Sequence, residues 1–163
     1  MKNSRILMVV SLCFVVSAVS FGQANFSGSW ALNESKSNFG DSQFRMASPT
    51  LAITQDATTF SIDKVFRGQD GEERKSTEKY TLDGKQSVNP MFNTEKKSTA
   101  TWAADKKSLT VASVMVFEFN GESSEIKTTE VYKLSESDKL LTIDTQSVSS
   151  RGERKTLAAY DKK

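Results

Sequence analysis

The residue types that most often carry enzyme chemistry are nearly absent from this chain of 163 residues. It has no His, and its single Cys, Cys13, lies inside an apolar N-terminal segment. Zinc sites, thiol catalysis and Ser–His catalysis all depend on these residue types. We therefore expect no enzyme activity of these common kinds, and we expect neither a metal nor a cofactor.

Most acidic residues have the placement of a solvated surface. They lie in expected turns, as Asp70, Glu72 and Asp138 do, and a Lys or Arg lies within the four positions after most of them. Ion pairs at exposed positions of this kind contribute little individually. The spacing is neither that of a calcium-binding loop nor that of the paired carboxylates of a glycosidase. We therefore place no catalytic pair among them.

Glu130 is the exception, because it alternates with Ile126, Tyr132 and Leu134 in a run with a period of two. Two interpretations are open. If this face is interior, partial desolvation would raise the pKa of Glu130, and its carboxyl could orient the polar end of a ligand. If the face is exterior, Glu130 is an ordinary surface acid opposite a Lys or Arg.

The elements that must position such groups begin after an N-terminal segment, residues 1–24, with the three-part pattern of a secretory signal peptide. A short basic start is followed by an apolar run from Ile6 to Val19, which is shorter than a membrane span requires. Small residues then follow, with Gly22 and Ala24 at positions −3 and −1 of a cut after Ala24. A cut two or three residues earlier fits as well. We expect export to the periplasm, or secretion, by a bacterium.

The remaining chain, residues 25–163, has the size of a single domain. The chain has 22 Lys and Arg and 20 Asp and Glu, which gives a formal charge of +2. Lys2 and Arg5 account for this excess, so the mature chain is near neutral. A near-neutral chain is unsuited to binding nucleic acid through bulk charge. It has no Cys for a disulfide and no second apolar segment of membrane length, so we expect no membrane span.

The mature chain has the pattern of strands throughout. Thr is frequent, Pro occurs twice, and hairpin signals such as Asp83-Gly84 and Asn120-Gly121 recur at short intervals. A polar segment could form a single helical turn capped by Asn33. The expected strands are 26–32, 50–56, 58–67, 73–82, 96–104, 108–119, 124–135, 139–149 and 153–161.

Strands joined by tight turns predict an all-β, up-and-down antiparallel meander. Because one long open sheet would expose two edges, we expect closure into an up-and-down barrel of about 8–10 strands. The expected inward faces mix apolar residues with Ser and Thr, which favours an internal cavity over a dry core. A filled core remains open as the alternative, because one β-bulge would invert the faces.

The first expected strand also carries a resemblance to a known group of proteins. Its pattern, with the polar pair that follows, resembles small exported bacterial lipocalin-like proteins of the calycin superfamily. Two further segments match the same group in order. The matching residues are Phe26, Gly28, Trp30, Leu32, Lys36 and Ser37, then Leu51, Ile53 and Asp56, and then Tyr80 to Lys85.

This resemblance implies a barrel that holds a small apolar molecule without a metal or cofactor. It also implies that Trp30 packs across the closed end of the barrel, with Gly28 in a structural role. An Arg near the last strand often lies against that ring in the superfamily, and Arg154 has the matching position for a cation–π contact.

Alternation and side-chain bulk select the residues that would line a cavity. We predict an exported binding protein that holds a small hydrophobic or amphipathic molecule. The alternative is a filled-core barrel or sandwich that acts as a cell-envelope interaction module without a small ligand. The candidate lining residues are Phe60, Ile62, Tyr80, Trp102, Met115, Phe117, Glu130, Tyr132 and Ile143.

Overall fold

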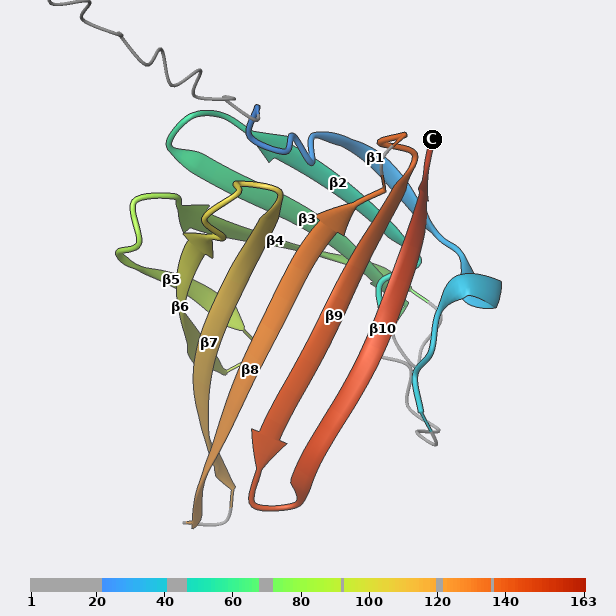
Figure 1. Cartoon of the computed structure of the whole chain (residues 1–163). Coiled ribbons are helices and arrows are strands. Elements are labelled where there is room, and N and C mark those ends of the chain that lie inside the picture. The colour runs from blue at the N-terminus through green and yellow to red at the C-terminus, as the bar shows by residue number, and fades with distance from the viewer. Residues whose placement is uncertain (1–21, 41–46, 68–71, 92, 120–121, 136) are drawn as a thin grey trace, which may run out of the picture.

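The computed structural model describes residues 22–40, 47–67, 72–91, 93–119, 122–135 and 137–163. Most of the expected signal peptide lies outside these residues. Within them the chain forms ten strands and one short 3-10 helix (Figure 1). The elements are β1 Gly28–Leu32, η1 Glu34–Lys36, β2 Thr50–Gln55, β3 Thr59–Arg67, β4 Glu73–Thr81, β5 Gln86–Met91, β6 Thr94–Trp102, β7 Ser108–Phe119, β8 Glu122–Leu134, β9 Leu140–Ser149 and β10 Gly152–Lys162.

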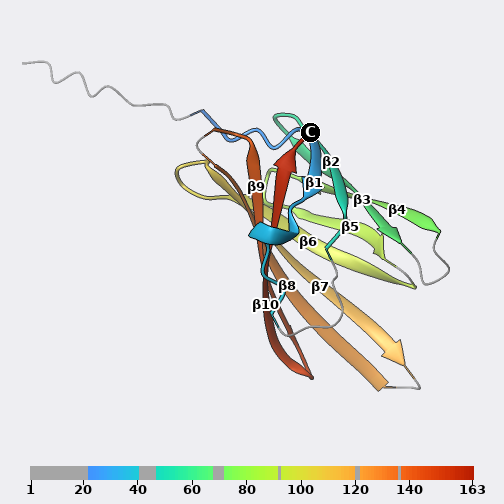
Figure 2. The same cartoon turned by 90° about the vertical axis from the view of Figure 1, so that its right-hand side faces the viewer.

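The strands form an antiparallel up-and-down meander, which confirms the predicted fold class. Their order in the sheet is β4-β3-β2-β1-β10-β9-β8-β7-β6-β5. Strands that follow each other in the sequence therefore pair, except β4 and β5, and the first strand, β1, also pairs with the last, β10. That pairing sets Trp30 opposite Lys162 and brings the two ends of the domain together. The expected helical turn is η1, capped by Asn33, and it lies on the outside of the barrel beside β10 (Figure 2).

The barrel is nearly closed, and its seam lies between β4 and β5. Among the described residues no main-chain ladder joins these two strands. Side chains take its place: Asn89 Oδ1 accepts from the Lys79 N–H at 2.7 Å, and Asn89 Nδ2 donates to the Lys79 carbonyl at 3.0 Å. Ser87 Oγ accepts from the Thr81 N–H at 3.0 Å. The side-chain amide of Asn89 therefore makes the two hydrogen bonds across the seam that a backbone amide would make in a ladder.

Strand β5 is the element that the sequence prediction missed. It contains Asn89 and Pro90, residue types that are uncommon in strands, and Pro has no N–H to donate to a ladder. Its place at the edge of the sheet explains why it tolerates Pro90. One side of β5 pairs with β6, and the other faces the seam, where side chains make the contacts.

One end of the barrel is filled by aromatic side chains and sealed by the segment before β1. The buried Phe26 ring stacks on Trp102 with ring centroids 5.8 Å apart, and it meets Phe60 and Tyr132 edge to face. The amide of Gln55 fixes this segment by accepting from the Phe26 N–H at 3.1 Å. This end of the interior therefore has a packed aromatic core.

Trp30 is completely buried in this core, and its Nε1 donates to the Phe26 carbonyl at 3.0 Å. The cation over its ring is Lys162, with Nζ 5.4 Å from the ring centroid, and this corrects the expectation for Arg154. Arg154 lies eight positions earlier in β10 and lines the cavity described below. Gly28 has φ +141°, and a Cβ there would lie 3.3 Å from Lys162 Cε, which explains the glycine.

Candidate functional site: the barrel cavity

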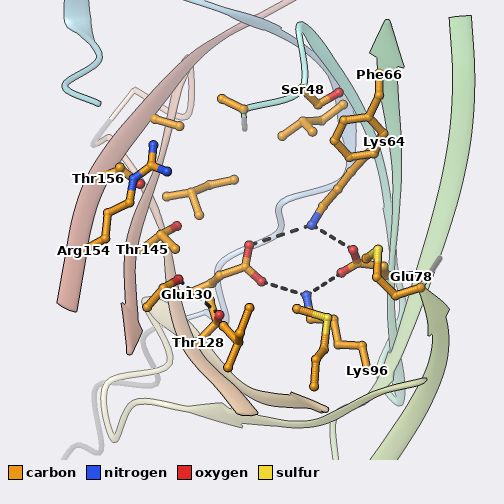
Figure 3. Close-up of a pocket in the computed structure, with 18 of the residues that line it drawn as sticks. Ser48, Lys64, Phe66, Glu78, Lys96, Thr128, Glu130, Thr145, Arg154 and Thr156 are labelled. Atoms are coloured by element: carbon orange, nitrogen blue, oxygen red, sulfur yellow. Dashed lines mark hydrogen bonds and ion pairs between the residues drawn. The ribbon is translucent and has the colours of Figure 1, made fainter. Parts of the chain in front are cut away.

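Beyond the aromatic end, the interior opens into a cavity of about 290 Å³ (Figure 3). Its wall is apolar over much of its extent, and short polar side chains of β8, β9 and β10 interrupt it. The apolar lining includes Phe39, Leu51, Phe66, Met91, Met115, Phe117, Ile126 and Ile143, and the polar lining includes Thr128, Thr145, Ser147, Arg154 and Thr156. The predicted mixture of apolar and hydroxyl side chains on the inward faces is therefore present.

Four charged side chains from four strands meet in this cavity, and we call them the ionic quartet: Lys64, Glu78, Lys96 and Glu130. The carboxylate of Glu78 forms ion pairs with Lys64 Nζ at 3.1 Å and with Lys96 Nζ at 2.9 Å. The carboxylate of Glu130 forms ion pairs with Lys96 Nζ at 3.3 Å and with Lys64 Nζ at 3.8 Å. Figure 3 shows the four groups in a ring of alternating sign. Each charge is therefore compensated by two opposite charges.

Strand alternation places the quartet between the aromatic core and the cavity. Successive inward side chains on one strand are two residues apart. Glu78 lies two residues before the buried Tyr80, and Glu130 lies two residues before the buried Tyr132. On the other side of Glu130 along β8, Thr128 lines the cavity. The quartet is therefore the floor of the cavity.

The electrostatics favour the ionised forms of Glu78, Glu130 and Lys96. Burial would raise the pKa of Glu78, but Lys64 and Lys96 outweigh it and lower the pKa to about 2. The same balance of burial against Lys64 and Lys96 lowers the pKa of Glu130. Burial would lower the pKa of Lys96, but Glu130 and Glu78 raise it. The quartet thus holds two positive and two negative charges.

Glu130 corrects one expectation. Its side chain faces the interior, but its pKa is lowered, because the cations of Lys64 and Lys96 overcome the desolvation that would raise it. Tyr80 adds a neutral donor to the same site, since its hydroxyl donates to Glu78. Burial is the main reason that the pKa of Tyr80 is raised, so the phenol keeps its proton.

The structure divides the nine predicted lining residues into two groups. Met115, Phe117, Glu130 and Ile143 line the cavity. The other five share the inward face but lie at the filled end, where Phe26 and its neighbours occupy the space. Phe60, Ile62, Tyr80 and Tyr132 belong to the buried core there, and Trp102 packs against it.

Sequence reasoning missed three quartet members, Lys64, Glu78 and Lys96. A signal was present, because Lys64 continues the alternation of Phe60 and Ile62, and Glu78 alternates with Tyr80. The period of two thus assigns these charges to the interior. We did not make this assignment, because charged residues usually face water.

No protein-family model and no curated protein matches the chain in sequence. Solved structures do match it, and two that cover most of the chain illustrate the likeness. One is the zebrafish ileal bile acid-binding protein complexed with cholic acid, with a TM-score of 0.55, 14% identity, and coverage of 85% of this chain and 98% of the other.

The second is a secretory abundant heat soluble (SAHS) protein from Ramazzottius varieornatus, with a TM-score of 0.56 and 12% identity. The match covers 88% of this chain and 98% of that protein. The chain has a calycin-type β-barrel fold. At these identities the likeness concerns the fold alone.

The calycin-type barrel offers an apolar cavity with one strongly polar, charge-balanced surface. That arrangement suits a molecule with an apolar body and a polar group better than it suits a metal ion. Among the described residues no three metal-ligating side chains gather, and no helix there is long and apolar enough to cross a membrane.

Proposed function

We propose that this protein is an exported bacterial binding protein that holds one small hydrophobic or amphipathic molecule in its barrel cavity. The observation that carries the proposal is the cavity of about 290 Å³, which has apolar walls and a polar floor. This volume is at the lower end of the about 300–1,000 Å³ typical of ligand pockets. A similarly folded protein crystallised with cholic acid gives further support.

The proposal is for binding without catalysis. A general acid or base works best with a pKa near the working pH. The pKa values of the charged groups on the cavity floor are moved away from neutral pH, because that of Glu78 is lowered to about 2 and that of Lys96 is raised. Groups held in this way suit orientation of a ligand and are poor at moving protons.

Two measurements test the binding proposal. Native mass spectrometry of protein purified from its own cells should find a stoichiometric small molecule, and solvent extraction should identify it. Emptied protein should bind the neutral fluorescent probe N-phenyl-1-naphthylamine at one site per chain. A protein that is empty and also ignores the probe would contradict the proposal and favour the filled-core interaction module.

A pair of neighbouring substitutions locates the bound probe. Met115 lines the cavity, whereas Val116 is 44% exposed on the outer face of the same strand. Met115→Trp should weaken probe binding by about tenfold or more, because the larger ring fills the space. Val116→Trp should bind as the wild type does. Equal affinity in the two variants would show that the probe binds elsewhere.

The proposed export has its own test at the start of the mature chain. The Ala24 N–H donates to the Lys106 carbonyl at 3.0 Å, and Gln55 Nε2 donates to the Ala24 carbonyl at 2.9 Å. A cut after Ala24 would remove both bonds. A cut after Gly22 keeps them and places the small residues Ser20 and Gly22 at −3 and −1.

We therefore expect the intact mass of the exported protein to correspond to a chain that begins at Gln23. A mature chain that begins at Asn25 would contradict the argument from these two hydrogen bonds. An unprocessed full-length chain that stays in the cytoplasm would contradict export itself.

A further inference from the structure

The four members of the ionic quartet differ in how they face the cavity. The side chains of Glu78 and Lys96 are 1% and 6% exposed, whereas those of Glu130 and Lys64 are 12% and 14% exposed. The ion pair between the two more exposed groups is also the longest, at 3.8 Å against 2.9 to 3.3 Å for the others. The quartet therefore presents one ammonium and one carboxylate, side by side, to the cavity.

Both of these groups can take a further hydrogen-bond partner. An ammonium has three donors, and a carboxylate oxygen can accept more than one bond. One oxygen atom can reach both Lys64 Nζ and Glu130 Oε1, because their 3.8 Å separation is shorter than two hydrogen bonds of about 2.8 Å laid end to end. A group that both donates and accepts satisfies this pair, and a hydroxyl is the smallest such group on an organic molecule.

The charge balance of the quartet selects against an anion at the same place. Its two cations already serve two carboxylates, so a ligand carboxylate beside Lys64 and Glu130 would add a buried negative charge that the quartet itself does not offset. An uncompensated buried charge is strongly unfavourable, whereas an uncharged hydroxyl leaves the balance unchanged. Among the described lining residues Arg154 is the one other charged group, and Figure 3 shows it beside Thr156, away from the quartet.

We infer that Lys64 and Glu130 bind an uncharged hydroxyl group of the ligand, which donates to Glu130 and accepts from Lys64. The protein then takes an aliphatic alcohol in preference to the carboxylate of the same chain length. This inference rests on the proposed binding function and specifies its ligand class: an amphipathic molecule whose inner end is a neutral hydroxyl.

Displacement of N-phenyl-1-naphthylamine from the mature protein by 1-decanol and by decanoate, near pH 7, tests the inference. The two ligands have the same chain length, so they differ mainly in the charge of the polar end. We expect decanol to displace the probe at a concentration about tenfold or more below that of decanoate, as a site built for a hydroxyl predicts. Decanoate that binds as tightly as decanol, or more tightly, would overturn the inference.

Two variants show which residues set the preference. Glu130→Gln leaves the quartet with one net positive charge, so decanoate should gain affinity and the preference for alcohol should shrink or reverse. If Glu130 has only a structural role, the substitution should lower the affinity for decanol and for decanoate by the same factor. Glu125→Gln, on the same strand at a side chain that is 49% exposed, should leave the preference unchanged, and a preference that shifts equally in the two variants would also overturn the inference.

The outcomes separate this inference from the proposed function. Protein that binds neither the probe nor either ligand contradicts the proposed function. Protein that binds the probe but does not prefer decanol contradicts only the hydroxyl assignment. If Glu130→Gln does not fold, as judged by circular dichroism, the wild-type comparison of decanol with decanoate decides alone.

Discussion

Removal of Lys96 gives the most direct test of the buried charge balance. Lys96→Met retains most of the length of the side chain and removes its charge. Lys96 is 4% exposed, and its Nζ lies 2.9 Å from Glu78 and 3.3 Å from Glu130. The variant therefore leaves two buried carboxylates with Lys64 as their single remaining cation. Breaking a buried ion pair in this way typically costs about 3–5 kcal/mol.

The pKa of Glu78 gives a second route to the same magnitude. Its pKa in the folded protein is about 2, against an ordinary value of 4.5. This difference corresponds to about 3 kcal/mol of stabilisation by the ionised form at neutral pH. Lys96 is one of the two cations responsible, and the other is Lys64. Lys96→Met removes its part of this effect at Glu78 and also removes the ion pair with Glu130, so we expect it to lower the free energy of unfolding at pH 7 by about 3 kcal/mol, the lower end of the cost of breaking a buried pair.

Urea unfolding followed by tryptophan fluorescence measures this change, because Trp30 is buried and Trp102 packs against the core. Lys97→Met is the matched control, since Lys97 is the next residue and faces solvent. Its effect should stay within about 0.5 kcal/mol. If Lys96→Met and Lys97→Met unfold at the same urea concentration, the assignment of Lys96 to a buried, balanced quartet is wrong.

The pH dependence adds a signed test. Because the folded-state pKa of Glu78 lies below its ordinary value, the stabilisation by its carboxylate is complete above about pH 4.5 and is lost as the pH falls toward 2. In Lys96→Met the remaining carboxylates should take up a proton more readily. The stability difference between wild type and variant should therefore be smaller at pH 4 than at pH 7, and a constant difference would contradict the electrostatic explanation.

Two further changes test the closed end and the seam. Trp30→Ala should cost about 3–5 kcal/mol in urea unfolding because it empties a completely buried site, whereas Val148→Ala, at a 45% exposed position, should cost under about 0.5 kcal/mol. Asn89→Ala should cost about 1–3 kcal/mol because it leaves the N–H and carbonyl of Lys79 without their partner, and Val88→Ala, at a 51% exposed position, serves as its control. A cost near zero for Trp30→Ala or Asn89→Ala would contradict the corresponding packing.

Local signals in the sequence were sufficient for most of the fold. Alternation along strands and turn residues between them act over a few positions, and they predicted nine of the ten strands with bounds close to those observed. Strand β5 was missed for a non-local reason. Asn89 and Pro90 disfavour a strand, and the feature that admits them, an edge beside a side-chain seam, exists only once the barrel has closed.

The candidate site was predicted less completely, because alternation identifies the inward face but not the depth along the barrel. Phe60 and Met115 both face inward, yet one is in the core and the other lines the cavity. The difference depends on Phe26, which enters the barrel end from a distant part of the chain and packs against Phe60. Neither strand carries a local sign of that contact.

The quartet also indicates what kind of interior this barrel has. A buried ion pair is weak evidence for stability, since apolar residues of similar volume are often as good or better. The aromatic end could continue through the level of Glu78 and Lys96 with apolar side chains, and the barrel would be filled. Instead, four balanced charges lie there, and the two most exposed, Lys64 and Glu130, face a cavity with apolar walls. A polar floor of this kind is better explained by a ligand's polar group than by the needs of folding, and this is why we favour a binding protein over a filled-core module.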